Sequence, residues 1–209
     1  MTQNNHIFML KNHMEKLYSS KNSVVRFVHN NRLEKIINLI PKKEEYKILD
    51  AGCGEGHLLK KIHDHFPKNY YYGVDITDIA LVSARKRCPF ANFQKMDLGN
   101  LAYDNEFFDI IICTEVLEHI YEYETVIAEL VRILKKDGML IISFPNETLW
   151  TLSRFILRRR PIKVPDHVNS FTPHKLSSKI KINQTAQISF PFSFLPFPIS
   201  LGCIMKFKK

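Results

Sequence analysis

Several features that would assign this chain to a broad class are absent. No apolar run reaches the roughly 18 residues that a membrane-spanning helix requires, and the mean hydropathy of the 209 residues is −0.17. Residues 1–16 are polar and lack the apolar segment of a signal peptide. The four cysteines have neither the spacing of metal ligands nor that of a redox pair. We therefore expect one cytoplasmic domain over residues 1–209, with reduced thiols.

Acidic residues are almost missing from the last third of the chain. Residues 150–209 contain 11 Lys and Arg and a single acid, Asp166, whereas the first 149 residues are close to neutral. Such an excess most often forms a solvated face, but it also suits an anionic partner. Because Trp150, Phe155 and Ile156 are interleaved with arginines, we expect a peripheral membrane or anionic surface contact through residues 150–209. Nucleic acid is the less favoured partner, since no RNA-binding module is recognisable.

The apolar periodicity predicts strands that alternate with helices. After a helical stretch within residues 1–40, the expected strands are 46–49, 70–76, 93–97, 108–113 and 139–144, and the expected helices are 57–66, 78–87 (capped by Thr77) and 124–136. This order indicates an α/β fold with a doubly wound, mostly parallel sheet and helices on both faces. Beyond residue 146 we expect helices at 148–160 and 176–180 and closing strands at 187–192 and 201–207.

Glycine occupies every second position in a turn between the first strand and the following helix. Gly52, Gly54 and Gly56 allow a sharp turn and a close ligand approach, which is typical of a nucleotide-binding corner. The spacing is not the G-x-G-x-x-G of dinucleotide binding. Asp50 would repel a pyrophosphate and instead suits a cationic amino-acid headgroup. At the ends of the next strands, Asp75 could accept hydrogen bonds from ribose hydroxyls, and Asp97 could reach an adenine amino group.

These pieces, together with the run Phe108 to His119, resemble the class I S-adenosylmethionine-dependent methyltransferases over about residues 46–145. The resemblance implies S-adenosylmethionine as the cofactor and a Rossmann-like, seven-stranded sheet whose last strand is antiparallel. It implies that the cofactor-binding residues are Asp50, Gly52, Cys53, Gly54, Gly56, Asp75, Ile76, Asp97, Leu98 and Thr114. No Asn-Pro-Pro-aromatic motif follows the fourth strand, which argues against methylation of adenine or of glutamine amides.

Two carboxylates and two imidazoles form a candidate catalytic group. Glu115, Glu118 and His119 would share one face of a helix, and His167 follows in a later loop. These four residues could bind Mg²⁺, Mn²⁺ or Zn²⁺. The pattern is similar to that of the ubiquinone-pathway O-methyltransferases and of methyltransferases that modify small-RNA 3′ ends, where such residues are metal ligands. The same Glu-x-x-Glu-His element also positions cofactor and helix in relatives without metal. Without a metal, His119 is the first candidate for a general base and His167 the second, with Glu115 beside them.

We expect three parts in the domain: a helical cap over residues 1–45, a cofactor-binding core over 46–146, and an acceptor-side lid with closing strands over 147–209. The predicted function is methyl transfer to a small-molecule acceptor, at an oxygen of a phenolic or lipid-like compound. The alternatives are an RNA ribose 2′-O-methyltransferase, a non-catalytic S-adenosylmethionine-binding partner protein and, more remotely, a dehydrogenase.

Overall fold

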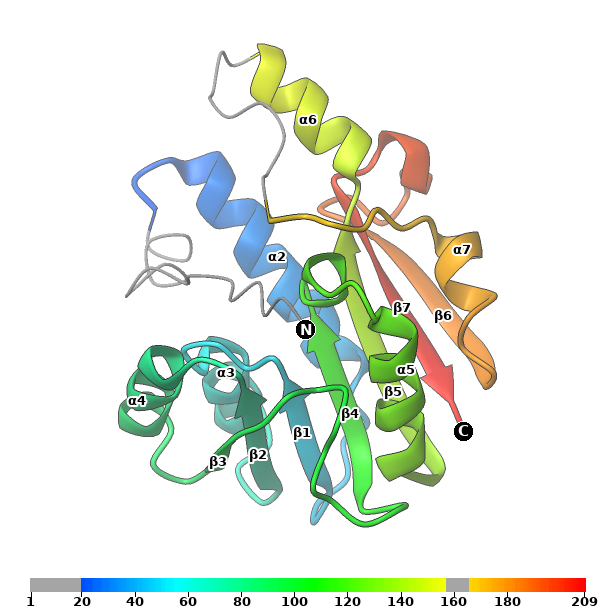
Figure 1. The fold of residues 1–209 in the computed structure, drawn as a ribbon. Coiled ribbons are helices and arrows are strands. Elements are labelled where there is room, and N and C mark those ends of the chain that lie inside the picture. The colour runs from blue at the N-terminus through cyan, green and yellow to red at the C-terminus, as the bar shows by residue number, and fades with distance from the viewer. Residues whose placement is uncertain (1–19, 157–165) are drawn as a thin grey trace, which may run out of the picture.

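One seven-stranded sheet organises the molecule (Figure 1). The computed structural model describes residues 20–156 and 166–209. The strand order is β3-β2-β1-β4-β5-β7-β6. Strands β1 to β5 pair in parallel, and β7 runs antiparallel to both β5 and β6. The expected doubly wound, mostly parallel sheet with an antiparallel last strand is therefore confirmed. The strands are β1 (Lys47–Ala51), β2 (Tyr70–Asp75), β3 (Asn92–Lys95), β4 (Phe108–Thr114), β5 (Leu134–Pro145), β6 (Asn183–Phe190) and β7 (Gly202–Lys208).

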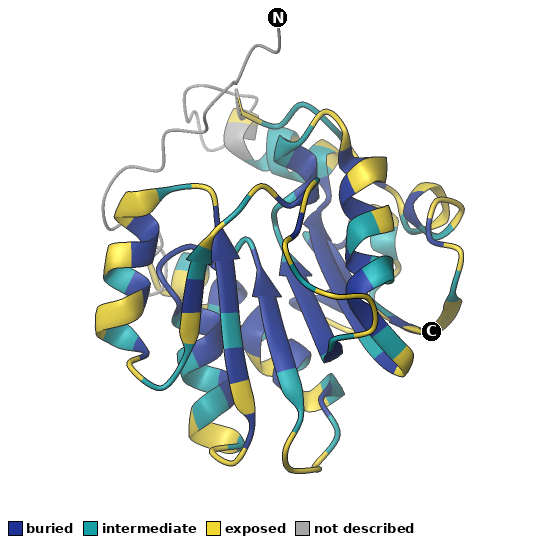
Figure 2. Cartoon of the chain, turned by 60° about the horizontal axis from the view of Figure 1, so that its bottom comes forward, coloured by how far each residue is buried: buried dark blue, intermediate teal, exposed yellow. Residues whose placement is uncertain are grey.

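Helices cover both faces of the sheet, because successive strand residues point to opposite sides. One core packs α2, α3 and α4 against residues such as Ile48 and Ile110, and the other packs α5 and α7 against their neighbours Leu49 and Ile111. Figure 2 shows the strands buried along most of their length and the helices exposed on the side away from the sheet. The helices are α2 (Ser23–Leu39), α3 (His57–His65), α4 (Asp78–Arg87), α5 (Tyr123–Ile133), α6 (Glu147–Ile156) and α7 (Pro173–Ser177), with 3₁₀ turns η1 (Leu117–His119) and η2 (Phe197–Ile199).

Several element boundaries differ from the expectation. The helix expected over 124–136 ends at Ile133, because Leu134 pairs with Phe108 and begins β5. Strand β3 ends at Lys95, so Asp97 lies beyond it. The Thr77 side chain does not cap α4, because its hydroxyl donates to Asp75 instead.

The C-terminal strands needed the largest correction. Strand β6 covers Asn183–Phe190 rather than 187–192, and it lies at the sheet edge with its first residues mostly exposed. An exposed edge strand needs few apolar side chains, so its polar beginning gives no strand signal. Helix α7 begins at Pro173, three residues before the expected helix. Helix α6 confirms the start of the basic helix expected over 148–160, whose last residues, 157–160, lie outside the described residues. Residues 1–19 of the expected N-terminal helical stretch also lie outside them.

The described residues contain no helix long and apolar enough to cross a membrane. Cys53, Cys88, Cys113 and Cys203 are all free and buried. Burial raises the pKa of the Cys53 thiol well above its usual value of about 9, which keeps it protonated.

Candidate active site

The glycine loop joins β1 to α3 at the carboxyl edge of the parallel strands. Gly52, Gly54 and Gly56 have φ angles of +80°, +50° and +78°, a region that side-chain-bearing residues rarely adopt. The N–H groups of Gly52 and Cys53 both donate to the Val74 carbonyl, at 2.8 and 2.9 Å, which holds the loop against β2. A Cβ atom on Gly52 would lie 2.5 Å from Cγ2 of Val116. The loop therefore requires glycine for both its turn and its close contact with the segment after β4.

Asp50 and Asp75 flank this loop with different environments. Asp50 is buried, and its Oδ1 has no hydrogen-bond partner among the described residues. Burial, followed by the nearby Asp75 charge, raises the pKa of Asp50 to about 8. Asp75 accepts hydrogen bonds from the N–H groups of Gly54 and Thr77, both at 2.9 Å. A buried carboxyl oxygen that lacks a donor fits the ammonium group of an amino-acid ligand, and this role of Asp50 stays a prediction.

The other expected cofactor residues follow the ends of neighbouring strands. Ile76 is exposed directly after β2, and Thr114 is the last residue of β4. Asp97 is exposed in the loop after β3, where its Oδ1 accepts from the Gly99 N–H at 2.8 Å. Its neighbour Leu98 is buried in the core that packs α5 and α7 against the sheet. All lie at the carboxyl edge of the sheet, where ligands bind in open α/β folds.

Glu115 does not share a helix face with Glu118 and His119. Its φ is +53°, and the next helical residues are the short 3₁₀ turn Leu117–His119, which does not include Glu115. The carboxylate forms an ion pair with Arg32 of α2, at 2.9 Å between Nη1 and Oε2, and accepts from the Ser143 hydroxyl at 3.1 Å. The expectation of one shared helix face is therefore wrong, and the Glu115 carboxylate is engaged by α2 and β5.

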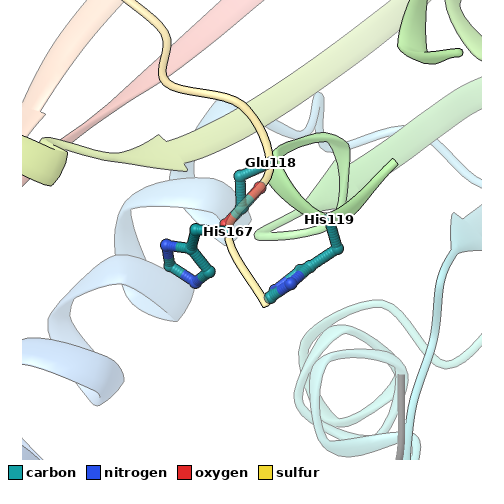
Figure 3. Close-up of side chains that lie close together, drawn as sticks. All are labelled: Glu118, His119 and His167. Carbon is teal, nitrogen blue, oxygen red and sulfur yellow. The ribbon is translucent and has the colours of Figure 1, made fainter. Parts of the chain in front are cut away.

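Glu118, His119 and His167 do converge (Figure 3). One potential ligand atom from each lies within 4.8 Å of the others. The backbone explains the meeting, because the N–H groups of Val168 and Asn169 donate to the Glu118 carbonyl at 2.8 and 3.0 Å. These hydrogen bonds attach the loop that carries His167 to the 3₁₀ turn that carries the other two residues.

Among the features of this cluster, the Glu118 carboxyl group most strongly favours a bound cation. It is 1% exposed, and neither oxygen has a hydrogen-bond partner among the described residues. Burial, followed by the Glu115 charge, raises its pKa well above the usual value. A buried carboxyl without partners is costly, so a bound cation would stabilise it.

The two histidines are held through the same ring atom. Nδ1 of His119 lies 2.9 Å from the Asp166 carbonyl oxygen, and Nδ1 of His167 lies 2.5 Å from Oε1 of Glu147. Both partners can only accept, so each Nδ1 carries a proton and each Nε2 keeps a lone pair when the ring is neutral. Burial lowers the pKa of His119, although the hydrogen bond from its ring to the Asp166 carbonyl opposes the shift.

A pocket of about 320 Å³ opens beside this cluster, lined by Glu147, Thr148, Thr151, His167, Val168, Asn169 and Ser170. A hollow of about 690 Å³ lies elsewhere, over the connection from α4 to β3, and contains none of the candidate site residues. Sequence reasoning missed Arg32, Ser143 and Glu147. The one available signal was an arginine placed next to Leu33 in the apolar stripe of α2.

The strand order, the glycine loop and the acids near the ends of β1 and β2 match the class I methyltransferase fold and its nucleotide-binding corner. Residues 49–142 match the sequence profile of a family described as "Methyltransferase domain". This match, together with relatives that are named as S-adenosylmethionine-dependent methyltransferases, supports a class I methyltransferase domain with S-adenosylmethionine as its cofactor.

Two curated relatives support the match. Trans-aconitate 2-methyltransferase from Variovorax paradoxus is 28% identical over 113 residues, which cover 54% of this chain and 44% of the relative. Ubiquinone biosynthesis O-methyltransferase from Coxiella burnetii is 29% identical over 156 residues, which cover 70% and 65%. The chain thus spans from less than half to about two thirds of the length of these relatives. The PH0226 protein from Pyrococcus horikoshii OT3 has the same fold, with a TM-score of 0.72, 20% identity and coverage of 92% and 95% of the two chains.

Proposed function

We propose that this protein transfers the methyl group of S-adenosylmethionine to an oxygen of a small-molecule acceptor of the phenol or catechol class. The observation that carries the proposal is the convergence of Glu118, His119 and His167. Glu118 follows two residues after Val116, which packs against Gly52 of the glycine loop. The name of the Coxiella burnetii relative, which is an O-methyltransferase, supports oxygen as the methylated atom.

When bound, the cofactor would supply a methyl group on a positively charged sulfonium sulfur, with the neutral thioether S-adenosylhomocysteine as the leaving group. The protein must then align the acceptor and help its hydroxyl lose a proton. We propose that Glu118, His119 and His167 hold a divalent cation such as Mg²⁺, Mn²⁺ or Zn²⁺. Such an ion lowers the pKa of a hydroxyl that it contacts. The partnerless Glu118 oxygens and the two Nε2 lone pairs suit this role. A role for Glu115 as a further ligand stays a prediction.

A metal-free version of the same reaction uses His119 as the general base. The lowered pKa of His119 keeps its imidazole neutral at neutral pH, so that Nε2 can accept the hydroxyl proton. His167 is the second candidate for this role.

Metal content and chelation distinguish the two versions. We expect the purified protein to methylate a catechol, to lose activity in a chelator and to regain it with Mn²⁺. His119→Ala should reduce the rate at least about 100-fold, whereas His65→Ala, on the outer part of α3, should not. A chelator-insensitive rate together with no bound metal would exclude the ion and leave His119 as the base. Absence of methyl transfer to any hydroxyl compound would contradict the proposal itself.

We also propose that the protein contacts an anionic membrane surface through an aromatic rim. This rim consists of Phe27 on α2 and Phe192 and Phe194 in the connection from β6 to β7; Phe194 is 82% exposed. The ring of Phe192 lies 6.2 Å from that of Phe27 and 5.8 Å from that of Phe194. Residues 190–201 contain no charged residue, and exposed Lys21 and Arg26 lie near the start of α2. Exposed aromatic side chains beside basic ones are typical of interfacial binding.

Co-sedimentation with vesicles tests the rim. We expect binding to vesicles of phosphatidylcholine and phosphatidylglycerol that weakens in salt, and weaker binding for Phe194→Ser. Tyr70→Ser is the matched control, because Tyr70 is also exposed but lies at the opposite, amino edge of the sheet. Equal binding of both variants would contradict the rim. Salt-sensitive binding to RNA without binding to vesicles would favour the nucleic-acid alternative.

A further inference from the structure

Glu147 and His167 form a hydrogen bond between two segments that lie 20 residues apart in the sequence. Glu147 is the first residue of α6, and His167 lies in the described segment that precedes α7. Oε1 of Glu147 and Nδ1 of His167 are 2.5 Å apart. The side chains are only 12% and 14% exposed, so water competes little for this hydrogen bond.

Hydrogen bonds fix the start of α6 to the connection between β6 and β7, which holds Glu147 in place. The preceding residue, Asn146, donates its backbone N–H to the Leu201 carbonyl and its side-chain amide to the Phe197 carbonyl, both at 2.9 Å. The backbone N–H of Leu149 is bonded to Oδ1 of Asn146. An acid in the first turn of a helix is common because it interacts favourably with the helix dipole. That role alone does not require a contact with a histidine 20 residues later in the chain.

The contact determines which nitrogen of His167 is available. A carboxylate cannot donate, so Nδ1 must carry the proton, and Nε2 remains the lone-pair atom that can face Glu118 and His119. His119 is held in the same way by the Asp166 carbonyl. Carboxylates and carbonyls that hold the second nitrogen of a ligating histidine fix its tautomer and raise its basicity.

We propose that Glu147 is a positioning residue that holds His167 in the Nδ1–H tautomer and directs its Nε2 toward Glu118 and His119. This inference rests on the proposed metal-binding role of the cluster for its effect on affinity, but the tautomer itself is a property of the metal-free protein. Glu147 also lines the neighbouring pocket, so its effect on the cluster has to be measured without an acceptor.

Titration with Mn²⁺ alone provides the first test. Glu147→Ala should raise the dissociation constant for Mn²⁺ by about 10–100-fold, the usual effect of losing such a partner. Glu147→Gln should lose less, because its amide oxygen can still accept from Nδ1. Glu124→Ala is the control, since Glu124 is an exposed first-turn acid on α5 that is paired with Lys179.

The second test reads the tautomer directly. In the ¹⁵N NMR spectrum of the metal-free protein, we expect Nδ1 of His167 to be protonated in the wild type and in Glu147→Gln. We expect a mixture of tautomers in Glu147→Ala. A purely structural contact would change the melting temperature without this pattern. If Glu147→Ala does not fold, Glu147→Gln with wild-type Mn²⁺ affinity and tautomer supports the inference, and a mixed tautomer in that variant contradicts it.

The two proposals fail in different ways. A wild-type protein that binds no Mn²⁺ overturns the metal site, while the ¹⁵N spectra still decide the role of Glu147. A folded Glu147→Ala with an unchanged tautomer overturns the positioning role, whatever the Mn²⁺ affinity is.

Discussion

At the scale of single residues, Gly52 is the most constrained position of the glycine loop. Its φ is +80°, and an added Cβ would lie 2.5 Å from Val116. We expect Gly52→Ala to lower the free energy of unfolding by about 1–3 kcal/mol and to weaken binding of S-adenosylhomocysteine, as measured by urea denaturation and calorimetry. Gly99→Ala is the control, because its nearest contact would be 3.4 Å and its φ is not in the left-handed region. Equal effects of the two variants would show that backbone strain is not the cause.

Asp50 should make the free energy of unfolding depend on pH. Its pKa is raised to about 8 by burial, followed by the charge of Asp75, whereas an unfolded aspartic acid has a pKa of about 3.9. The folded state therefore binds this proton more tightly. The resulting stabilisation is complete below about pH 4 and disappears as the pH rises through about 8. We expect the free energy of unfolding of the ligand-free protein to fall between pH 5.5 and 7.5 more steeply than that of Asp50→Asn. Parallel curves in urea denaturation would contradict this.

At the scale of elements, Arg32 connects α2 to the carboxyl end of β4. Arg32 is buried, with 4% of its side chain exposed, and it pairs with Glu115, which is 22% exposed. The guanidinium also lies 5.9 Å from the centre of the Phe190 ring at the end of β6. One side chain thus joins three elements that are distant in the sequence.

Removing the Arg32 side chain should weaken the attachment of α2 to β4 and β6. We expect Arg32→Met to cost about 2–4 kcal/mol of stability, somewhat less than a fully buried pair because Glu115 is partly exposed. Amide hydrogen exchange of α2 should become faster. In contrast, Lys68→Met breaks a mostly exposed pair with Glu44 and should cost no more than about 1 kcal/mol. An Arg32 variant as stable as the Lys68 variant would show that α2 is held by its apolar face alone.

At the scale of the whole molecule, the increase in melting temperature with an added ligand should show which class of cofactor the protein binds. A ligand at 100 times its dissociation constant stabilises the folded state by about 2.7 kcal/mol. For a domain of this size, that corresponds to an increase in melting temperature of about 5–10 °C. We expect S-adenosylhomocysteine to produce such a shift and NAD to produce none. A shift with NAD alone would support the dehydrogenase alternative.

The sequence predicted best those elements that local residues define, and it predicted least well those that depend on pairing with other strands. Helix α4 begins at Asp78 and ends at Arg87 as expected, because Pro89 and the apolar spacing define it locally. Strand β6 was misplaced because its pairing with β7, rather than its own composition, stabilises its polar residues. The ends of α5 and β3 were misjudged for the same reason, since sheet pairing decides where they stop.

The sequence by itself determined the nucleotide-binding corner. Asp50, the three loop glycines and Asp75 belong to a short strand–turn–helix–strand segment whose geometry follows from local chain chemistry. The resemblance to class I methyltransferases needed only these residues and the order of the motifs after them.

Only the tertiary structure decided which candidate catalytic residues meet. His167 reaches Glu118 and His119 because backbone hydrogen bonds attach its loop to the 3₁₀ turn, and no spacing in the sequence encodes those bonds. Glu115 is near Glu118 in the sequence, yet its positive φ and its ion pair with Arg32 direct its carboxylate elsewhere. Glu147 became a candidate only because folding brings the start of α6 against His167. Contacts between distant segments depend on the packing of the whole domain, so local patterns could propose these residues but not pair them.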